Sequence, residues 1–187
     1  MRIVLASKSP RRKALLSEIS NDFLTFDSNI DESLSYKLYK PSKIVVDIAY
    51  RKALKAKEVY PDDLIIAADT IVVLNYEILH KPKDAKDAKK ILKLLSGKTH
   101  TVITGYTIMY KDQIIKDLEL SFVTFNTLSD ELIDAYIASG SPLDKAGAYG
   151  IQDNDKFPLV KSYVGSYSNI VGLPMERIKE ELEKIKK

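Results

Sequence analysis

Between positions 3 and 13 the chain reads Ile3-Val4-Leu5-Ala6-Ser7-Lys8-Ser9-Pro10-Arg11-Arg12-Lys13. The apolar run at 3–6 predicts a buried strand that stops at Ser7. Ser9 is a good helix N-cap, and Pro10 suits the first helical position, where no N–H group is needed. The stretch therefore predicts a strand that leads through a tight turn into a helix.

The predicted turn gathers backbone N–H groups, two hydroxyls and several cationic side chains at one helix N-terminus. Cations at that end oppose the helix dipole and cost roughly a few tenths of a kcal/mol each, unless an anion lies between them. Phosphate is the natural anion for such a place. The turn thus indicates a class of ligand before any other motif is considered.

The composition is that of an ordinary globular domain. A chain of 187 residues with 45% hydrophobic content buries enough apolar surface to fold without a covalent or metal staple. It has no cysteine, which excludes disulfides and thiolate chemistry and leads us to expect a cytoplasmic protein. No apolar run approaches the roughly 20 residues of a membrane span. The net charge of +3 is spread along the chain, so we expect neither a membrane nor a nucleic-acid partner.

The hydrophobic periodicity predicts a single domain over residues 1–187 without a linker. Strands are expected at 3–6, 23–27, 64–68, 71–74, 77–79, 99–110 and 113–126. Helices are expected from position 10, over 41–60 and 84–95, between 129 and 140, and from about position 174. Residues 29–40 are predicted to be a loop. Because hairpins occur among helices, we expect an α/β fold of mixed α+β character whose sheet is mixed rather than doubly wound and parallel.

Lys52 is unusual because it falls within the apolar stripe of the long predicted helix. That stripe is formed by Ile44, Val45, Ile48, Ala49, Ala56 and Val59. At 100° per residue, Lys52 lies in the middle of the stripe rather than on the wet side. An inward-facing lysine needs an anionic partner or a route by which its ammonium reaches water. Periodicity alone leaves both interpretations open.

Asp69 follows the apolar run 64–68, so we expect it at the end of a buried strand. Sites are built at strand ends in α/β sheets, and a carboxylate there can bind a hard metal or activate water. The alternative is an Asx turn at Asp69-Thr70 that joins two strands of a hairpin. Taken alone, the residues favour neither interpretation.

Three further features carry weak signals of their own. Glu32 lies in a polar loop and Lys81 precedes a proline, and such charges are usually only solvated. In the stretch 144–152, two glycines bracket a small residue and an aromatic, which indicates close backbone approach to a planar group or a tight turn. Gln152 has both a donor and an acceptor with which to read the edge of a base.

Together these stretches resemble the Maf-type nucleoside triphosphate pyrophosphatases, in the branch that acts on dTTP and UTP. The resemblance is carried, in the family's order, by residues 5–12, 31–32, 49–53, 68–72, 81–82, 96–105, 144–152 and 165–174. It implies an elongated mixed sheet flanked by helices, with a nucleotide cleft, as in the Maf and inosine triphosphatase-like folds. It also implies a divalent metal, expected to be Mg²⁺ with Mn²⁺ or Co²⁺ as alternatives, and a homodimer.

The implied reaction is hydrolysis of the α–β phosphoanhydride of dTTP, UTP or modified pyrimidine nucleotides, with a role in cleaning the nucleotide pool. Four side chains are implied to bind the triphosphate: Ser7, Arg12, Lys52 and Lys81. Two carboxylates are implied at the metal, of which the first is also the general base: Asp69 and Glu32. Three positions match those tied to nucleotide choice: Arg11, Thr70 and Gln152.

Two positions depart from the family's pattern. His80 precedes the Lys-Pro pair where the family usually has glycine. Ser141 stands where the family tends to have an acidic residue. Either departure could loosen substrate preference or be neutral, and neither touches the hydrolytic chemistry.

Three alternatives remain. One is a nucleotide-binding regulator of cell division, since the family's name derives from effects on septum formation. The acidic Asp69 argues against it, because a sensor needs no carboxylate to activate water. The others are a purine-directed inosine or xanthosine triphosphatase, and nucleic-acid binding through the basic turn, which would be strongly salt-dependent.

Overall fold

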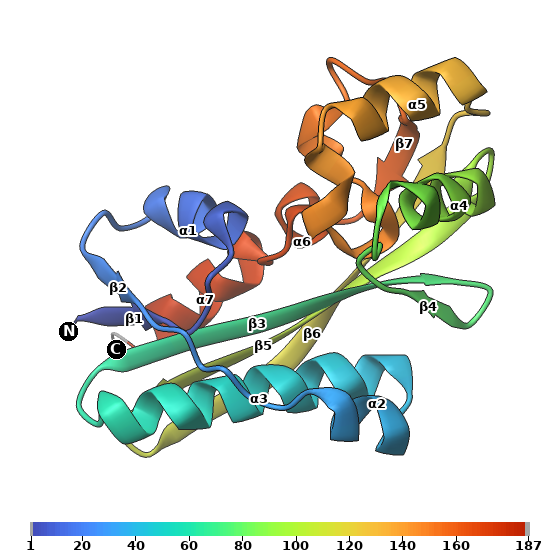
Figure 1. Cartoon of the computed structure of the whole chain (residues 1–187). Coiled ribbons are helices and arrows are strands. Elements are labelled where there is room, and N and C mark those ends of the chain that lie inside the picture. The colour runs from blue at the N-terminus through green and yellow to red at the C-terminus, as the bar shows by residue number, and fades with distance from the viewer. Residues whose placement is uncertain (1, 186–187) are drawn as a thin grey trace. The chain divides into compact units, whose positions relative to one another are not determined.

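The described residues, 2–185, form a mixed sheet with strand order β2-β1-β3-β5-β6-β7, and β4 pairs with β3 (Figure 1). The structure is a computed structural model. The strands are β1 (Ile3–Leu5), β2 (Phe23–Thr25), β3 (Leu64–Leu74), β4 (Glu77–Leu79), β5 (Thr99–Tyr110), β6 (Gln113–Phe125) and β7 (Val160–Val164). β1 pairs in parallel with β2 and β3, whereas the β3–β4 and β6–β7 pairs are antiparallel. The predicted α/β class and mixed sheet are confirmed.

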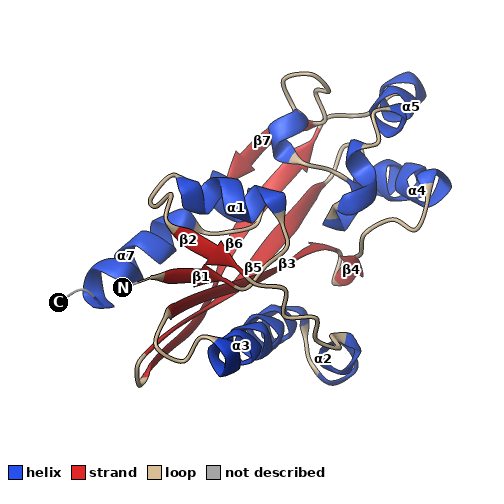
Figure 2. Cartoon of the chain, turned by 60° about the vertical axis from the view of Figure 1, so that its left-hand side comes forward, coloured by secondary structure: helices blue, strands red, loops and turns tan. Residues whose placement is uncertain are grey.

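Helices flank the strands (Figure 2). They are α1 (Pro10–Ser17), α2 (Ser33–Leu38), α3 (Pro41–Val59), α4 (Ala85–Leu95), α5 (Asp130–Ala138), α6 (Tyr167–Val171) and α7 (Met175–Ile185). Three short 3₁₀ turns precede β7: η1 (Ser141–Asp144), η2 (Ala146–Ala148) and η3 (Ile151–Asp153). In the part of the chain that is described, no helix is long and apolar enough to cross a membrane.

The chain divides into two compact units, which are described separately. The described part of unit 1 comprises residues 2–70, 103–119 and 166–185, and unit 2 comprises 71–102 and 120–165. β3, β5 and β6 each contribute residues to both units.

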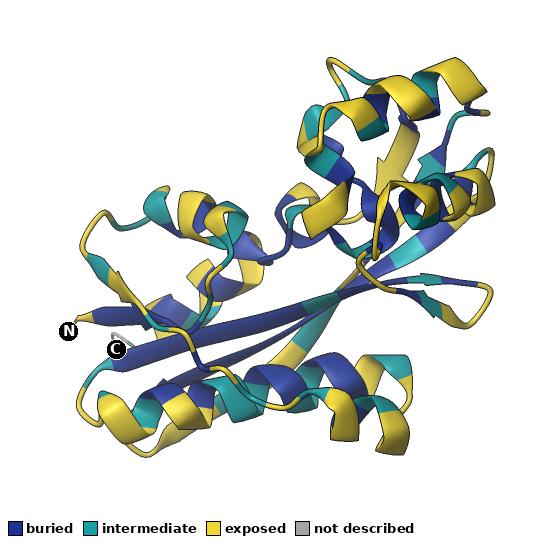
Figure 3. Ribbon diagram, viewed as in Figure 1, coloured by how far each residue is buried: buried dark blue, intermediate teal, exposed yellow. Residues whose placement is uncertain are grey.

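In unit 1 both faces of the sheet are apolar, which explains the uninterrupted hydrophobic run of β3 (Figure 3). Leu64, Ile66 and Ala68 belong to a core cluster with residues of α1 and α7. The alternate residues Ile65 and Ala67 pack instead with alanines of α3. Because successive side chains of a strand point to opposite faces, the run fills two cores at once.

α3 approaches β5 closely, and a glycine makes this possible. A Cβ added at Gly105 would lie 2.4 Å from the carbonyl carbon of Val45. Real Cβ atoms do not come so near to backbone, so only glycine permits this distance. The glycine thereby brings the helix that carries Lys52 against the sheet.

Unit 2 has an aromatic core formed by His100, Phe125 and Tyr149. Their rings meet edge to face with centroids 4.8–5.2 Å apart. His100 Nε2 and the Tyr149 hydroxyl are 2.7 Å apart. Burial lowers the pKa of His100 to about 4, so the ring is neutral at pH 7.

β3 differs from its prediction. It is one strand of eleven residues, so Asp69 lies inside the strand, and the expected strand end at residue 68 is wrong. The turn at Asp69-Thr70 is wrong for the same reason. The hairpin instead turns at Asn75 and Tyr76, which have φ values of 50° and 69°. Asp69 and Thr70 stay in the strand because their polar groups find partners in the folded chain.

Two short helices were not predicted from the sequence. α2 lies within 29–40, where the Asp31 carboxylate accepts a hydrogen bond from Ser33 N at 2.9 Å. α6 lies in the polar stretch after Gly165, where Ser166 Oγ accepts from Asn169 N at 3.0 Å. Ser166 thus caps α6, whereas the N-cap residue of α2, Glu32, makes no capping hydrogen bond with its side chain. Helical spacing of apolar residues reveals neither of these local bonds.

Candidate functional site

The turn between β1 and α1 has the predicted form. Ser9 is the N-cap of α1, and its hydroxyl accepts a hydrogen bond from Arg12 N at 3.4 Å. Ser7 Oγ accepts from Ser9 N at 3.2 Å. Two of the N–H groups expected to be open to an anion are therefore used by hydroxyls of the turn. Lys8 Nζ forms an ion pair with Asp27 at 2.6 Å, so the charge of this lysine is already balanced within the chain.

The Arg12 guanidinium is held by three hydrogen bonds. Nε donates to the Gly172 carbonyl at 2.7 Å, Nη2 to Thr70 Oγ1 at 3.0 Å and Nη1 to Ser7 Oγ at 3.3 Å. Burial lowers the pKa of Arg12, against the opposing effect of the nearby Asp69 charge. Arg12 is thus a cation of fixed orientation, as recognition of a phosphate oxygen requires.

Lys52 joins two carboxylates. Its Nζ lies 3.0 Å from Asp69 Oδ1 and 2.7 Å from Glu32 Oε1. The interpretation that Lys52 faces inward toward an anionic partner is confirmed. The three groups come from α3, β3 and the residue that precedes α2, so they meet only in the folded chain.

Asp69 is the most deeply buried charged group of this set. Burial raises its pKa, while the charges of Lys52 and Arg12 pull the pKa back down. Its Oδ2 atom is buried and has no hydrogen-bond partner in the structure. A carboxylate with one oxygen on an ammonium and the other unused is suited to accept a proton from water or to bind a cation.

Thr70, next to Asp69, links segments that lie far apart in the sequence. Besides its bond from Arg12, its hydroxyl lies 2.9 Å from Thr104 Oγ1. Thr104 in turn donates to the Asn169 carbonyl at 3.2 Å. The sequence analysis missed Thr104 and the Gly172 carbonyl as supports of Arg12, because residues from β5 and α6 reach Thr70 only after folding. Arg11 is near enough to lower the pKa of Arg12 by charge repulsion.

Tyr36 is a further residue that the sequence analysis missed. Burial raises its pKa, and the charges of Asp69 and Glu32 raise it further, which places the phenol in the field of both carboxylates. Tyr36 follows Glu32 by four residues, the spacing of neighbours on one helix face. The signal went unused because this segment was predicted to be a loop.

The donor set of Asp69 and Glu32 fits a hard divalent cation. Within residues 2–185, no group of three or more His, Cys, Asp or Glu could hold a metal by itself. Mg²⁺ does not need one, since it is commonly bound by one or two carboxylates together with substrate phosphates and water. The unused, buried Oδ2 of Asp69 supplies one suitable oxygen.

Lys81 and Gln152 belong to unit 2, where both are exposed. The structure therefore brings together the predicted site residues of unit 1. The roles of Lys81 and Gln152 at the site stay predictions. In the glycine-containing stretch, side chains of the chain itself lie close to Gly150. A Cβ at Gly150 would lie 2.8 Å from both Gln152 Nε2 and Lys145 Cε.

The two departures from the family's pattern also lie in unit 2. The His80 carbonyl accepts a hydrogen bond from Gly147 N at 3.3 Å. Ser141 Oγ donates to Asp153 Oδ2 at 2.6 Å, and its hydroxyl and carbonyl both accept from Lys145 Nζ. Ser141 thus satisfies the Lys145 ammonium together with Asp144.

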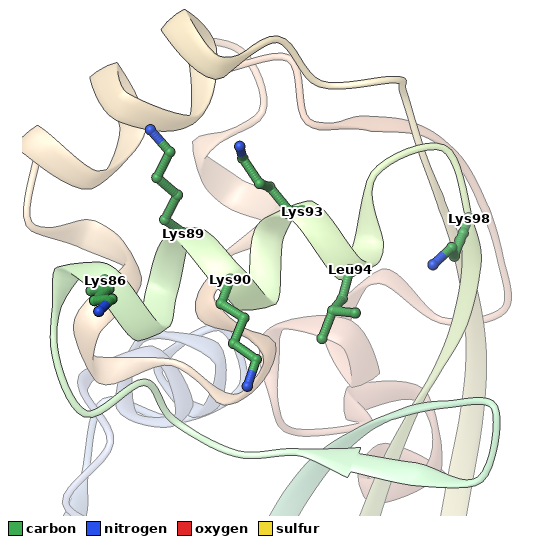
Figure 4. Close-up of a pocket in the computed structure, with 6 residues that line it drawn as sticks. All are labelled: Lys86, Lys89, Lys90, Lys93, Leu94 and Lys98. Atoms are coloured by element: carbon green, nitrogen blue, oxygen red, sulfur yellow. The ribbon is translucent and has the colours of Figure 1, made fainter.

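A groove of about 450 Å³ on α4 lies apart from the predicted residues in the sequence (Figure 4). It is lined by Lys86, Lys89, Lys90, Lys93, Leu94 and Lys98. Two of these lysines are paired with α5, Lys89 with Asp134 and Lys93 with Asp130. No carboxylate lines the groove, so it has no group that could activate water.

Known proteins resemble this chain over nearly its whole length. The model of the family described as "Maf-like protein" matches residues 2–185. A protein of Thermosipho africanus named dTTP/UTP pyrophosphatase is 48% identical over 95% of this chain and 90% of its own. Proteins with the same name from Pyrococcus furiosus and Bacillus cereus are 48% and 45% identical, over 93% and 97% of this chain and 90% and 94% of their own.

Proposed function

The chain belongs to the Maf family, and from this premise we propose that it hydrolyses dTTP and UTP to the nucleoside monophosphate and pyrophosphate. Asp69 is the observation on which the proposal rests. This carboxylate is buried, pairs through Oδ1 with Lys52 and keeps Oδ2 unused. A protein that only bound nucleotide would have no need of such a carboxylate, since the negative charge of the carboxylate repels the triphosphate.

The proposed chemistry is the addition of water across the α–β phosphoanhydride. The water oxygen bonds to the phosphorus on one side of the bridge, and the bond between that phosphorus and the bridging oxygen breaks. The bridging oxygen leaves with the other phosphate, so that the nucleoside monophosphate and pyrophosphate separate, and the Asp69 carboxylate takes the proton that water loses. Burial favours this role because it raises the pKa of Asp69, and a base is most effective when its pKa lies nearer the working pH.

The cations divide the work of binding the triphosphate. Arg12, with its orientation fixed by Gly172, Thr70 and Ser7, binds a phosphate oxygen. Lys52 neutralises charge beside the base and holds Asp69 in place. Lys81 is proposed as a further cation for the triphosphate, and Arg11 and Gln152 as residues that select the nucleotide.

We propose Mg²⁺ as the cofactor, with Asp69 and Glu32 as its protein ligands. When bound, it would neutralise charge that develops on the phosphate oxygens. The substrate phosphates would then complete the set of ligands.

The proposed setting is the cytoplasm, where the enzyme would remove dTTP, UTP and modified pyrimidine nucleotides from the pool. The absence of cysteine supports a reducing compartment. An effect on septum formation would follow from altered nucleotide supply rather than from a separate activity.

The test is a panel of nucleoside triphosphates with Mg²⁺, with release of pyrophosphate as the readout. We expect dTTP and UTP to be hydrolysed faster than ITP, XTP and the common purine nucleotides. Asp69→Asn should lose about 10²–10³-fold in kcat, the effect typical of one electrostatic or proton-transfer group.

Asp134→Asn is the matched control, because it also removes a carboxylate from a lysine partner, but at an exposed place. Normal pyrophosphate release by Asp69→Asn would contradict the role of Asp69. Preference for ITP or XTP would favour the purine-directed alternative. Nucleotide binding without any release would favour a regulator.

We also propose a homodimer. Leu120 and Phe122 project from the same face of β6, and both are exposed. Val164 of β7 pairs with Phe122 in register and is 70% exposed. Adjacent exposed apolar side chains on a sheet face support association with a second copy.

A further inference from the structure

α2 is held against α3 by one arginine. Arg51 Nη2 donates to the Asp31 carbonyl at 2.6 Å, and Nη1 donates to Ser35 Oγ at 3.1 Å. The two acceptors lie on either side of Glu32 in the sequence. Arg51 therefore binds both the backbone just before Glu32 and the first turn of α2, which follows Glu32.

A carboxylate of α3 completes this contact. Ser35 Oγ donates to Asp47 Oδ2 at 2.7 Å, and Asp47 lies 3.8 Å from Arg51, one helical turn away. Ser35 is only 1% exposed, so its hydroxyl is shielded from competing water. Asp47, Ser35 and Arg51 thus form a connected polar group, in which each hydrogen bond strengthens its neighbour.

The leucines of α2 add little to its stability. The helix has six residues, too few to be stable by itself. Its two leucines, Leu34 and Leu38, are 54% and 60% exposed, so burial of apolar surface contributes little. Ser35 is the buried residue of the helix, and it belongs to the polar group.

Arg51 and Lys52 are consecutive on α3, and they act on the same segment. Arg51 holds the backbone around Glu32, while Lys52 holds the Glu32 carboxylate at 2.7 Å and Asp69 at 3.0 Å. Tyr36, also on α2, lies in the field of both carboxylates. Movement of α2 would displace the Glu32 carboxylate from Lys52 and Asp69.

We propose that Arg51 is a positioning residue for the hydrolysis, which fixes the start of α2 so that the Glu32 carboxylate stays on Lys52, beside Asp69. Its effect on turnover rests on the proposed function, whereas its effect on α2 does not. Arg51 suits the task better than lysine, because its planar fork reaches two acceptors at once.

The experiment combines hydrogen exchange with kinetics. In Arg51→Ala we expect the amides of residues 31–38 to exchange at least tenfold faster, measured by mass spectrometry. We expect kcat for dTTP to fall ~10–100-fold, as is usual when a group that orients a metal ligand is lost. Arg51→Lys can reach only one acceptor, so its exchange rate at residues 31–38 and its kcat should lie between those of the wild type and Arg51→Ala.

Lys55→Ala is the matched control, because Lys55 is a cation one turn further along α3, paired with Glu58 in an exposed ion pair. It should change neither readout. If Arg51→Ala does not fold, Ser35→Ala provides the second variant, since it breaks the same group from the other side. Unchanged exchange in 31–38, or faster exchange with kcat equal to that of Lys55→Ala, would overturn the proposal.

A variant of Glu32 separates positioning from general stability. In a Glu32→Gln background, Arg51→Ala should cost much less of kcat than in the wild type, because the residue it positions is already altered. An equal loss in both backgrounds contradicts the proposal. If the wild type releases no pyrophosphate from any triphosphate, the proposed function fails, and the exchange data still decide whether Arg51 holds α2.

Discussion

Asp69 combines a structural cost with a proposed catalytic benefit. A carboxylate inside a buried strand loses hydration, and Lys52 and Arg12 restore only part of that loss, since the pKa of Asp69 remains raised. Function and stability therefore make opposite demands on this one residue. Two predictions follow from that opposition, one for unfolding and one for turnover.

Asp69→Asn should be as stable as the wild type at pH 8, or more stable. Because the folded-state pKa of Asp69 is raised above its unfolded value of 3.8, its contribution to stability is fully present below pH 3.8 and is lost as pH rises through the folded pKa. Urea unfolding of both proteins at pH 4 and pH 8 measures this. A variant that lost more stability at pH 8 than at pH 4 would show that the ion pair with Lys52 outweighs burial.

The same raised pKa sets the acid limb of activity. A general base must be ionised, so kcat/KM should fall as pH drops through the pKa of Asp69, at a pH above the usual 3.8 for aspartate. The residual activity of Asp69→Asn should lack this limb. Protonation of the nucleotide affects both proteins alike, so the difference between the two profiles isolates Asp69. Identical profiles would assign the limb to another group.

At the scale of elements, the distance between α3 and the sheet positions Lys52. The helix can come close only because β5 carries Gly105 beneath it. A side chain there would push α3 outward, and Lys52 with it. The close packing of α3 on Gly105 therefore helps to set the position of Lys52 in the site.

Gly105→Ala should lower the free energy of unfolding by about 1–3 kcal/mol, the usual cost of overpacking a tight core. Its Cβ would meet backbone atoms of Val45, which cannot rotate away. Gly140→Ala is the comparison, because nothing lies within 4 Å of that Cβ and only its φ of +75° opposes the change. Denaturant unfolding should show the larger loss for Gly105→Ala. A larger loss for Gly140→Ala would mean that α3 adjusts easily.

Elements whose signals are local were predicted well. Ser9 accepts the backbone hydrogen bond expected of an N-cap. The predicted helices at 84–95 and 129–140 likewise begin at side-chain caps, Asp84 and Ser129. β3 was predicted as two strands, and α2, α6 and β7 were not predicted. Asp69-Thr70 resembles a turn in sequence, and only bonds from Lys52 and Arg12 make a continuous strand the better state.

At the scale of the whole molecule, the exposed apolar side chains of β6 and β7 are the feature that calls for a partner. Phe122 is 48% exposed, and its register partner Val164 more so. Monomeric proteins rarely leave adjacent large apolar groups on a sheet face. A second copy of the chain is the proposed occupant.

Phe122→Lys combined with Val164→Lys should weaken the dimer by at least about tenfold in Kd, since central apolar contacts carry most of an interface's energy. Sedimentation velocity over a range of concentrations measures this. Val59→Lys is the control, because Val59 is a comparably exposed apolar residue at the end of α3. A wild type that sediments as a monomer, or a control that dissociates equally, contradicts the proposed interface.

The amino-acid sequence alone accounts for the order of most strands and helices, the β1–α1 turn and the inward direction of Lys52. These depend on periodicity and capping, which involve residues a few positions apart. Only the tertiary structure decides which groups meet. Lys52 finds Asp69 and Glu32, and Arg12 finds Thr70 and Gly172, across as many as 160 positions. Such pairs depend on how strands pair and helices pack, and burial then makes their charges matter, because water no longer screens them.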